Sequence, residues 1–332
     1  MTDGGTPMQE SRGAGTSSHS RGGRKVLFRV VKYLLLAILL YFLYGHVRQL
    51  YASWQENEVT TLRAEWIAAA AASYAVGQLF FARYWWRLLQ NLGLAPGFAG
   101  TLRAYAAGTL GKYIPGKAMV VVLRTGMLPG GKAEKLTVGL SVLSETVTMM
   151  AMGAAVSTIC LVVSFPSGWP AWGGAAGLAI GLFGLTHPWV FERISHVVSM
   201  PFGKDRPRVP ARQYRISLIL PVAGWCMSGV SAWCTGLAVD AAYVTGIDWL
   251  AWTGATALAT AAGFLVIIAP SGMAVRELVI IYVLTSFHPE SSVVLAALLL
   301  RLTWTLTEVG LAGVMYAWAW YSRVDVQPIL EK

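Results

Sequence analysis

Residues 252–287 read WTGATALATAAGFLVIIAPSGMAVRELVIIYVLTSF. Two long apolar runs flank Pro270-Ser271-Gly272. Proline removes a backbone donor and glycine relaxes the backbone, so a helix has to stop at this point. We therefore predict two helices separated by a short non-helical break.

The same pattern occurs once more, earlier in the chain. Residues 98–113 are followed by Ile114-Pro115-Gly116 and then by a short apolar run to residue 127. A break inside a membrane is tolerated only where it is buried in protein or lines a polar cavity. Interrupted segments in corresponding places of two halves also point to a transporter site. We expect each broken element to form a re-entrant helical hairpin.

The composition places these elements in a membrane. Of the 332 residues, 55% are hydrophobic and 13% are charged, whereas a soluble domain carries about 25% charged residues. An ordinary soluble enzyme is therefore excluded. About 20 apolar residues cross a bilayer as a helix. Besides the two broken elements, the predicted spans are residues 26–44, 66–89, 136–165, 172–190, 216–239 and 292–321. The predicted fold class is an all-α polytopic integral membrane protein, with about six full spans and two re-entrant hairpins.

The net charge of +10 is concentrated in three blocks. Residues 1–32, 83–135 and 191–215 carry net charges of +4, +7 and +4, so the rest of the chain carries −5. Basic loops stay in the cytoplasm. We therefore expect a cytoplasmic N-terminus and two hairpins that enter from opposite sides, which is the arrangement of an inverted repeat. The positive charge then orients the protein and does not indicate a nucleic-acid partner.

The predicted organisation is one transmembrane domain between two tails. Repeat one covers about residues 63–165, and repeat two covers about residues 216–321. The tail at the N-terminus is rich in Gly, Ser and Arg and lacks the apolar residues that a core needs. The predicted boundaries are a disordered basic tail at 1–25, the transmembrane domain at 26–322 and a short cytoplasmic tail at 323–332.

Ionisable residues inside apolar segments are costly and mark functional sites. Arg301 and Glu308 are seven residues apart, so they lie on one helix face, two turns from each other. A structural alternative is that Arg301 pairs with Glu308 or Glu145 and locks helices together. No histidine pair or cysteine pair has metal-ligand spacing, so we expect no metal or cofactor. The candidate site residues are Lys117, Arg124, Glu145, Arg276, Glu277, Arg301 and Glu308.

Two motifs resemble the signatures of the lysylphosphatidylglycerol synthase transmembrane family. Residues 110–117, LGKYIPGK, followed by Arg124, resemble the first signature, and residues 269–277, APSGMAVRE, resemble the second. That family contains the flippase half of the multiple peptide resistance factors. The resemblance covers about residues 26–321. Ser271 and Ala274 depart from it, because the family commonly has glycine at both positions.

The resemblance implies an inner-membrane protein that flips an anionic or zwitterionic lipid between leaflets. Arg124, Lys117 and Arg276 would be the phosphate partners in a polar groove between the two hairpins. Glu145, Glu277 and Glu308 would balance these cations, bind an amine or carry a coupling proton. The chain ends at Lys332 without the synthase domain, so we expect no enzymatic activity.

Several alternatives stay open at this point. The lipid is either a glycerophospholipid or a polyprenyl-phosphate-linked glycan carrier. A membrane-embedded enzyme acting on lipid-linked substrates is one rival, although the loops lack the adjacent carboxylates of a metal site. A structural or accessory subunit of an envelope assembly is another. The sequence also leaves open whether each broken element is re-entrant or crosses the membrane fully, whether transport is coupled and whether the chain forms a homodimer.

Overall fold

The computed structural model shows helices joined by short turns in the residues that it describes. It describes residues 62–113, 118–165, 216–240, 244–265 and 274–322, with scattered residues between 41 and 52 and between 173 and 180. No strand occurs in these residues, so the predicted all-α class is confirmed for them. The predicted spans at 26–44 and 172–190 lie mostly outside the described residues.

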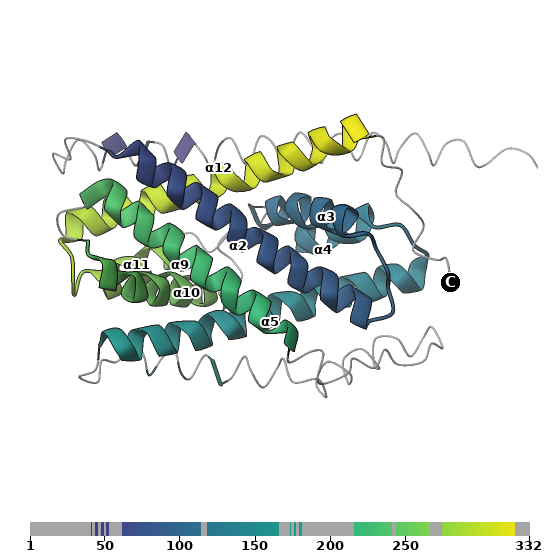
Figure 1. Ribbon diagram of the computed structural model, residues 1–332, viewed down its shortest axis with the longest axis horizontal. Coiled ribbons are helices and arrows are strands. Elements are labelled where there is room, and N and C mark those ends of the chain that lie inside the picture. The colour runs from purple at the N-terminus through teal and green to yellow at the C-terminus, as the bar shows by residue number, and fades with distance from the viewer. Residues whose placement is uncertain are drawn as a thin grey trace, which may run out of the picture.

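The α-helices follow the apolar runs of the sequence (Figure 1). Their bounds are α2 Ala64–Asn91, α3 Phe98–Leu110, α4 Ala118–Met127, α5 Lys132–Ser164, α9 Ile219–Asp240, α10 Trp249–Leu265, α11 Val275–Leu284 and α12 Glu290–Ser322. Short 3₁₀ turns, η1 (Gly111–Tyr113) and η3 (Gly246–Asp248), follow α3 and precede α10.

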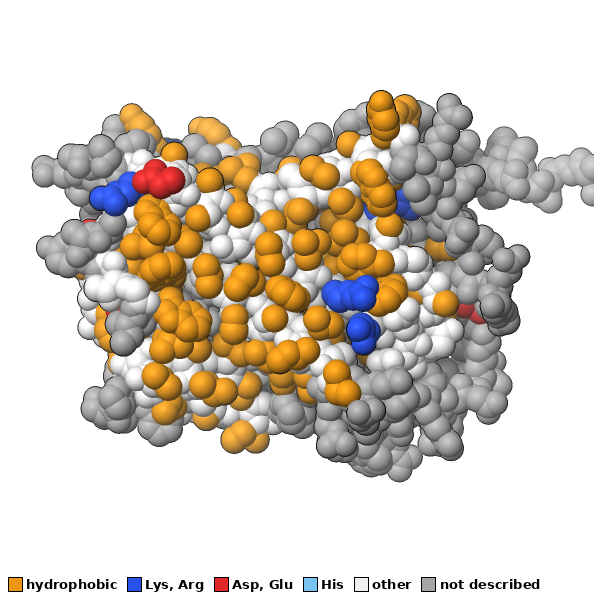
Figure 2. All heavy atoms as spheres, viewed as in Figure 1, with side chains coloured by type: hydrophobic (Ala, Val, Ile, Leu, Met, Phe, Trp, Pro, Cys, Tyr) orange, Lys and Arg blue, Asp and Glu red, His pale blue; other side chains and the backbone are white. Residues whose placement is uncertain are grey.

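Three of the described helices are long and apolar enough to cross a membrane. These segments are Glu134–Ser164 of α5, Ile219–Asp240 of α9 and Glu290–Tyr321 of α12. Figure 2 shows that hydrophobic and uncharged side chains cover most of the described part of one face. The chain is therefore an α-helical membrane protein. Helix α2, predicted as a span, is long enough but is not among the three.

Helices α2 and α9 pack against each other in antiparallel directions. At one end, the Arg63 amide donates a hydrogen bond to the Ala238 carbonyl over 3.1 Å. Further along, a Cβ on Gly77 would lie 3.1 Å from the Gly224 carbonyl oxygen, and Phe81 fills the space above Gly224. Small residues let membrane helices approach closely, because van der Waals packing rather than water exclusion holds them together.

The remaining helices pack in a reciprocal pattern around α2 and α9. Helix α3 packs on α12, and α10 packs on α5. Likewise α4 packs on α3 and α5, while α11 packs on α10 and α12. In Figure 1, α3 and α4 lie at one end of the molecule, α10 and α11 at the other, and α5 and α12 run along opposite sides. In each half, a helix before the break therefore packs against the long last helix of the other half, α12 or α5.

Helices also flank both predicted breaks. Helix α3 continues through η1 to Tyr113 before α4 begins, and α10 ends at Leu265 before α11 begins at Val275. The break residues themselves, Pro115-Gly116 and Pro270-Ser271-Gly272, lie outside the described residues, as does Lys117. Ala274, just before α11, has φ of +62°, a conformation that favours glycine.

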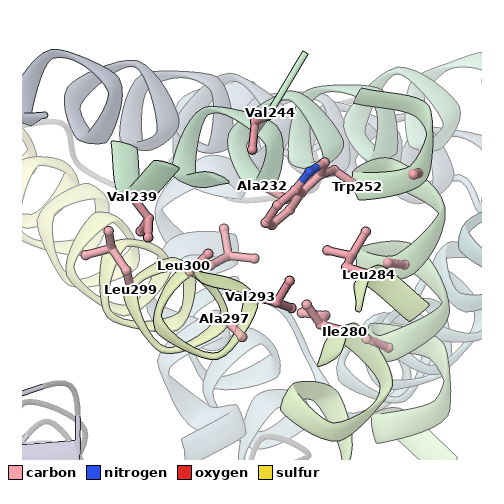
Figure 3. Close-up of a cluster of buried hydrophobic side chains, with 14 of the residues drawn as sticks. Ala232, Val239, Val244, Trp252, Ile280, Leu284, Val293, Ala297, Leu299 and Leu300 are labelled. Atoms are coloured by element: carbon pink, nitrogen blue, oxygen red, sulfur yellow. The ribbon is translucent and has the colours of Figure 1, made fainter. Parts of the chain in front are cut away.

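The second half contains a tight core of buried apolar side chains. Trp252 of α10 is 1% exposed and packs among Ala232 of α9, Leu284 of α11 and Leu300 of α12 (Figure 3). A second cluster around Trp85 and Trp225 joins α2, α5 and α9. These clusters hold the ends of the broken elements in place.

Candidate functional site

A cavity of about 750 Å³ lies where the two halves meet. All of the helices α2–α5 and α9–α12 contribute to its lining. This volume falls within the ~300–1,000 Å³ of typical ligand pockets. Most lining side chains are apolar, and the charged ones are Lys112, Arg124, Glu145 and Arg276. A mainly apolar wall with a few converging charges is typical of a ligand site.

The mouth of this cavity is aliphatic. Among its lining residues, Val122 on α4, Leu143 on α5 and Leu265 on α10 are 58%, 55% and 54% exposed. In a membrane protein, exposed aliphatic side chains on apolar helices face lipid. The cavity therefore has an apolar rim and charged residues deeper in.

Arg124 and Glu145 form a buried ion pair on the cavity wall. The Arg124 Nη1 atom lies 2.8 Å from Glu145 Oε2, and the two side chains are 5% and 2% exposed. The guanidinium carbon of Arg124 lies 4.2 Å from the Tyr105 ring centre and 4.8 Å from the Trp85 ring centre. Cation–π contacts of this kind stabilise a desolvated cation. The arginine is thus held by one carboxylate and two aromatic rings.

Gly108 on α3 makes room for Arg124. A Cβ at Gly108 would lie 2.9 Å from the Arg124 Nε atom and 3.1 Å from its Cδ atom. Any larger residue would push the arginine away from its rings. The position of Arg124 therefore depends on α3 as well as on α4.

A second buried ion pair joins Glu277 on α11 to Arg301 on α12. The structural alternative paired Arg301 with Glu308 or Glu145, and the structure shows other ion-pair partners for these two acids. Glu308 binds Lys112 and Glu145 binds Arg124. Helix packing decides these partners, because α11 turns Glu277 toward α12 while Glu308 lies about two turns along from Arg301.

Glu308 gathers three donors from the first half of the chain. Lys112 Nζ and the Tyr74 hydroxyl both bind its Oε1 atom, and the Tyr113 hydroxyl donates to Oε2 over 2.9 Å. Glu308 is 2% exposed. A buried carboxylate requires such partners, because an isolated charge is costly away from water. Glu308 therefore links α12 to both α2 and the end of α3.

Sequence reasoning missed Lys112, Tyr74 and Tyr113 as site residues. Lys112 could have been found, because it lies directly before the break in the same motif as Lys117. The two tyrosines have no comparable signal. Tyr74 sits in an ordinary apolar run, and only the fold stacks its ring on Trp304, with 4.3 Å between ring centres.

Arg276 is the remaining charged residue of the cavity. It lines both the large cavity and an adjoining space of about 30 Å³, which it shares with Lys112, Glu277 and Arg301. Its Nε atom is buried and has no hydrogen-bond partner among the described residues. The guanidinium also lies within electrostatic range of Arg301 and Glu308.

The charges that the structure describes here do not cancel. Three ion pairs, Lys112–Glu308, Arg124–Glu145 and Arg301–Glu277, each contain one cation and one carboxylate. Arg276 adds a fourth cation. The group therefore has a formal charge of +1, which favours a ligand that carries negative charge.

The structure thus brings together most of the predicted site residues. Arg124, Glu145 and Arg276 line the large cavity, while Glu277 and Arg301 line the adjoining one. Glu308 borders a further space of about 30 Å³ that shares Gln78, Tyr105 and Thr109 with the large cavity. The described residues contain no group of three His, Cys, Asp or Glu side chains that could hold a metal ion.

Comparison with known proteins assigns no family to the chain. No family model matches it, and no curated protein matches it. The similarity to the lysylphosphatidylglycerol synthase transmembrane family therefore stays a prediction, and two short motifs carry it.

Proposed function

We propose that the chain translocates an anionic or zwitterionic lipid between the leaflets of a bacterial-type inner membrane. One observation carries the proposal. This membrane protein contains a cavity with an aliphatic rim, and the described charged group at and beside it, three ion pairs and Arg276, has one cation more than it has carboxylates. A lipid has the matching chemistry, because its headgroup is polar and its acyl chains are apolar.

The physical problem that such a site solves is the desolvation of the headgroup. Moving an isolated charge from water into an apolar medium costs tens of kcal/mol by Born estimates. Arg276, Arg124 and Lys112 replace water around the headgroup, and arginine can bind its phosphate in a bidentate manner. The acyl chains stay in lipid beyond Val122 and Leu143. The headgroup then crosses without losing all of its polar partners.

The proposed arrangement has about six spans and two re-entrant hairpins that enter from opposite sides. The reciprocal packing of the two halves and the antiparallel α2 and α9 support this proposal. The positive blocks favour a cytoplasmic N-terminus. Transporters with inverted repeats place their substrate where broken helices meet near the midplane. Lys117, beside the first break, would join Arg276 in the phosphate path.

The two motifs add independent support. Residues 110–117 and 269–277 resemble the signatures of the lysylphosphatidylglycerol synthase transmembrane family, whose flippase members move lipids. Lys112 and Arg276 belong to these motifs, and both line the cavity.

The experiment is lipid translocation by purified protein in liposomes, with fluorescent phospholipid and polyprenyl-phosphate probes in separate samples. We expect Arg276→Gln to lower the initial rate at least tenfold, because it removes the surplus cation. The matched control is Arg87→Gln, which removes an exposed arginine from α2 and should keep the wild-type rate.

The outcomes separate the alternatives. Movement of the polyprenyl probe but not of the phospholipid would make the chain a transporter of glycan carriers. Failure of well-folded wild-type protein to move either probe would overturn the proposal and leave a structural or accessory role. In that case Arg276→Gln should disturb folding rather than transport.

A further inference from the structure

The pair Arg124–Glu145 is one hydrogen bond short on each side. Among the described residues, Arg124 Nε has no acceptor and Glu145 Oε1 has no donor, and both atoms are buried. The two residues are 4% and 1% exposed and line the large cavity. Leaving a buried donor or acceptor unsatisfied is costly. A pair that carries both defects at a cavity wall points to a ligand that repairs them.

The chemistry of the missing partner follows from the two atoms. Nε needs an acceptor and Oε1 needs a donor. A hydroxyl group is both, whereas a quaternary ammonium is neither and a primary ammonium only donates. Neither atom is exposed in this structure, so entry of the ligand has to shift the pair slightly toward the cavity.

Charge also favours a hydroxyl at this position. Arg124 and Glu145 already neutralise each other at 2.8 Å, so the pair offers little net attraction to another charge. The aromatic faces that would hold a quaternary ammonium are those of Tyr105 and Trp85. Arg124 itself already lies over both rings.

The rest of the cavity supplies one positive charge. Arg276 lines the same cavity and is the cation left over after the three ion pairs are counted. A phosphodiester carries a single negative charge and would neutralise it. A zwitterionic headgroup would bring an additional cation into a site that is already at +1.

We infer that the cavity selects a monoanionic phosphodiester lipid whose headgroup bears hydroxyls. The phosphodiester meets Arg276, and a headgroup hydroxyl bridges Arg124 Nε and Glu145 Oε1. This inference rests on the proposed lipid-binding function and narrows its substrate class. Two sources share the chemistry: a glycerophospholipid with a polyol headgroup, and a polyprenyl-phosphate-linked sugar.

The test measures binding of single lipids to the full chain in detergent by native mass spectrometry. Phosphatidylglycerol, phosphatidylmethanol and phosphatidylcholine with identical acyl chains are compared. Phosphatidylmethanol keeps the phosphodiester charge but has no hydroxyl, so it isolates the contribution of the hydroxyl. Phosphatidylcholine then isolates the effect of the extra cation. A polyprenyl-phosphate hexose distinguishes the two sources.

We expect phosphatidylglycerol or the polyprenyl-phosphate hexose to bind at least tenfold more tightly than phosphatidylmethanol, which corresponds to about 1.4 kcal/mol. Phosphatidylcholine should bind more weakly still. Arg124→Lys keeps the charge but removes Nε, so it should abolish the preference over phosphatidylmethanol. The same exchange at the exposed Arg87, Arg87→Lys, should keep the preference.

Equal binding of all three glycerophospholipids to the wild-type protein would overturn the inference, whether or not Arg124→Lys folds. A preference that survives in folded Arg124→Lys would also overturn it. Selective binding without translocation in liposomes would instead overturn the proposed function and leave the headgroup site standing. No binding of any lipid would overturn both.

Discussion

The two halves of the chain build the same kind of ion pair with opposite polarity. In the first half, the short helix after the break, α4, carries the cation Arg124, and the long helix α5 carries Glu145. In the second half, the short helix α11 carries the carboxylate Glu277, and the long helix α12 carries Arg301. The packing of the helices is reciprocal, but the charges are not.

This difference in charge makes the binding site asymmetric. Two identical halves would place identical charges around the cavity. Instead, the Arg124–Glu145 pair lines the large cavity, while the Glu277–Arg301 pair lines the adjoining space that Arg276 shares with it. Among the described residues that line the large cavity, Arg276 is the cation that belongs to none of the three ion pairs. A reciprocal scaffold therefore carries an asymmetric binding site.

The link between the halves gives the largest expected effect. Replacing the buried Glu308 by Gln leaves Lys112, whose side chain is 23% exposed, without its carboxylate and weakens the acceptor for the buried hydroxyls of Tyr74 and Tyr113. Breaking a buried pair in this way costs about 3–5 kcal/mol. We expect a loss of that size in SDS-titration unfolding of the protein in mixed micelles. The control Glu290→Gln, an exposed change at the start of α12, should be nearly neutral, and equal midpoints for both variants would contradict the link.

Removing the carboxylate of one ion pair at a time compares the two halves directly. Glu145→Gln should cost about 3 kcal/mol, because its partner Arg124 is 5% exposed. Glu277→Gln should cost roughly 1 kcal/mol less, because that carboxylate is 15% exposed and partial solvation screens it. The same unfolding titration measures both variants. A larger loss for Glu277→Gln would reverse this ranking of the two pairs.

Close backbone packing between η1 and α4 gives the next effect. A Cβ on Gly111 would lie 2.8 Å from the Val120 amide nitrogen of α4, and backbone cannot move aside as a side chain can. We expect Gly111→Ala to destabilise by about 2 kcal/mol. Gly126→Ala is the control, since no atom lies within 4 Å of its added Cβ. That change should stabilise α4 by about 0.5–1 kcal/mol, and the two midpoints should therefore move in opposite directions.

The smallest effect concerns Ala274, just before the short helix α11 of the second half. Ala274 has φ of +62° and ψ of −43° just before α11. A residue with a Cβ is strained there, so Ala274→Gly should stabilise the protein by about 1 kcal/mol. Thermal unfolding in detergent measures the shift, and a lower midpoint would show that the alanine side chain makes a compensating contact.

Part of the fold was predictable from local pattern alone. Runs of apolar residues set the positions of α5, α9 and α12, because a helix has to satisfy its own backbone in lipid. Prolines and glycines at 115–116 and 270–272 placed the gaps between α3 and α4 and between α10 and α11. Helix ends were less predictable, since α5 runs from Lys132 to Ser164 rather than from residue 136 to residue 165.

The candidate site was predictable as a list of residues but not as a set of partners. Arg124, Glu145 and Arg276 stood out because charges are rare in apolar segments. Which acid meets which base depends on how helices far apart in the sequence cross. Glu308 and Lys112 are 196 residues apart, and no periodicity relates them.

The amino-acid pattern is therefore enough to predict that the chain lies in lipid, that it is helical, where its two breaks lie and which charged residues lie in its apolar segments. These properties follow from hydrophobicity and backbone chemistry within one segment. Tertiary packing alone shows that Arg301 binds Glu277 and that Tyr74 and Tyr113 bind Glu308. It also shows that the described charges at and beside the cavity include one cation more than carboxylates. These properties depend on the crossing of helices, which a single segment does not encode.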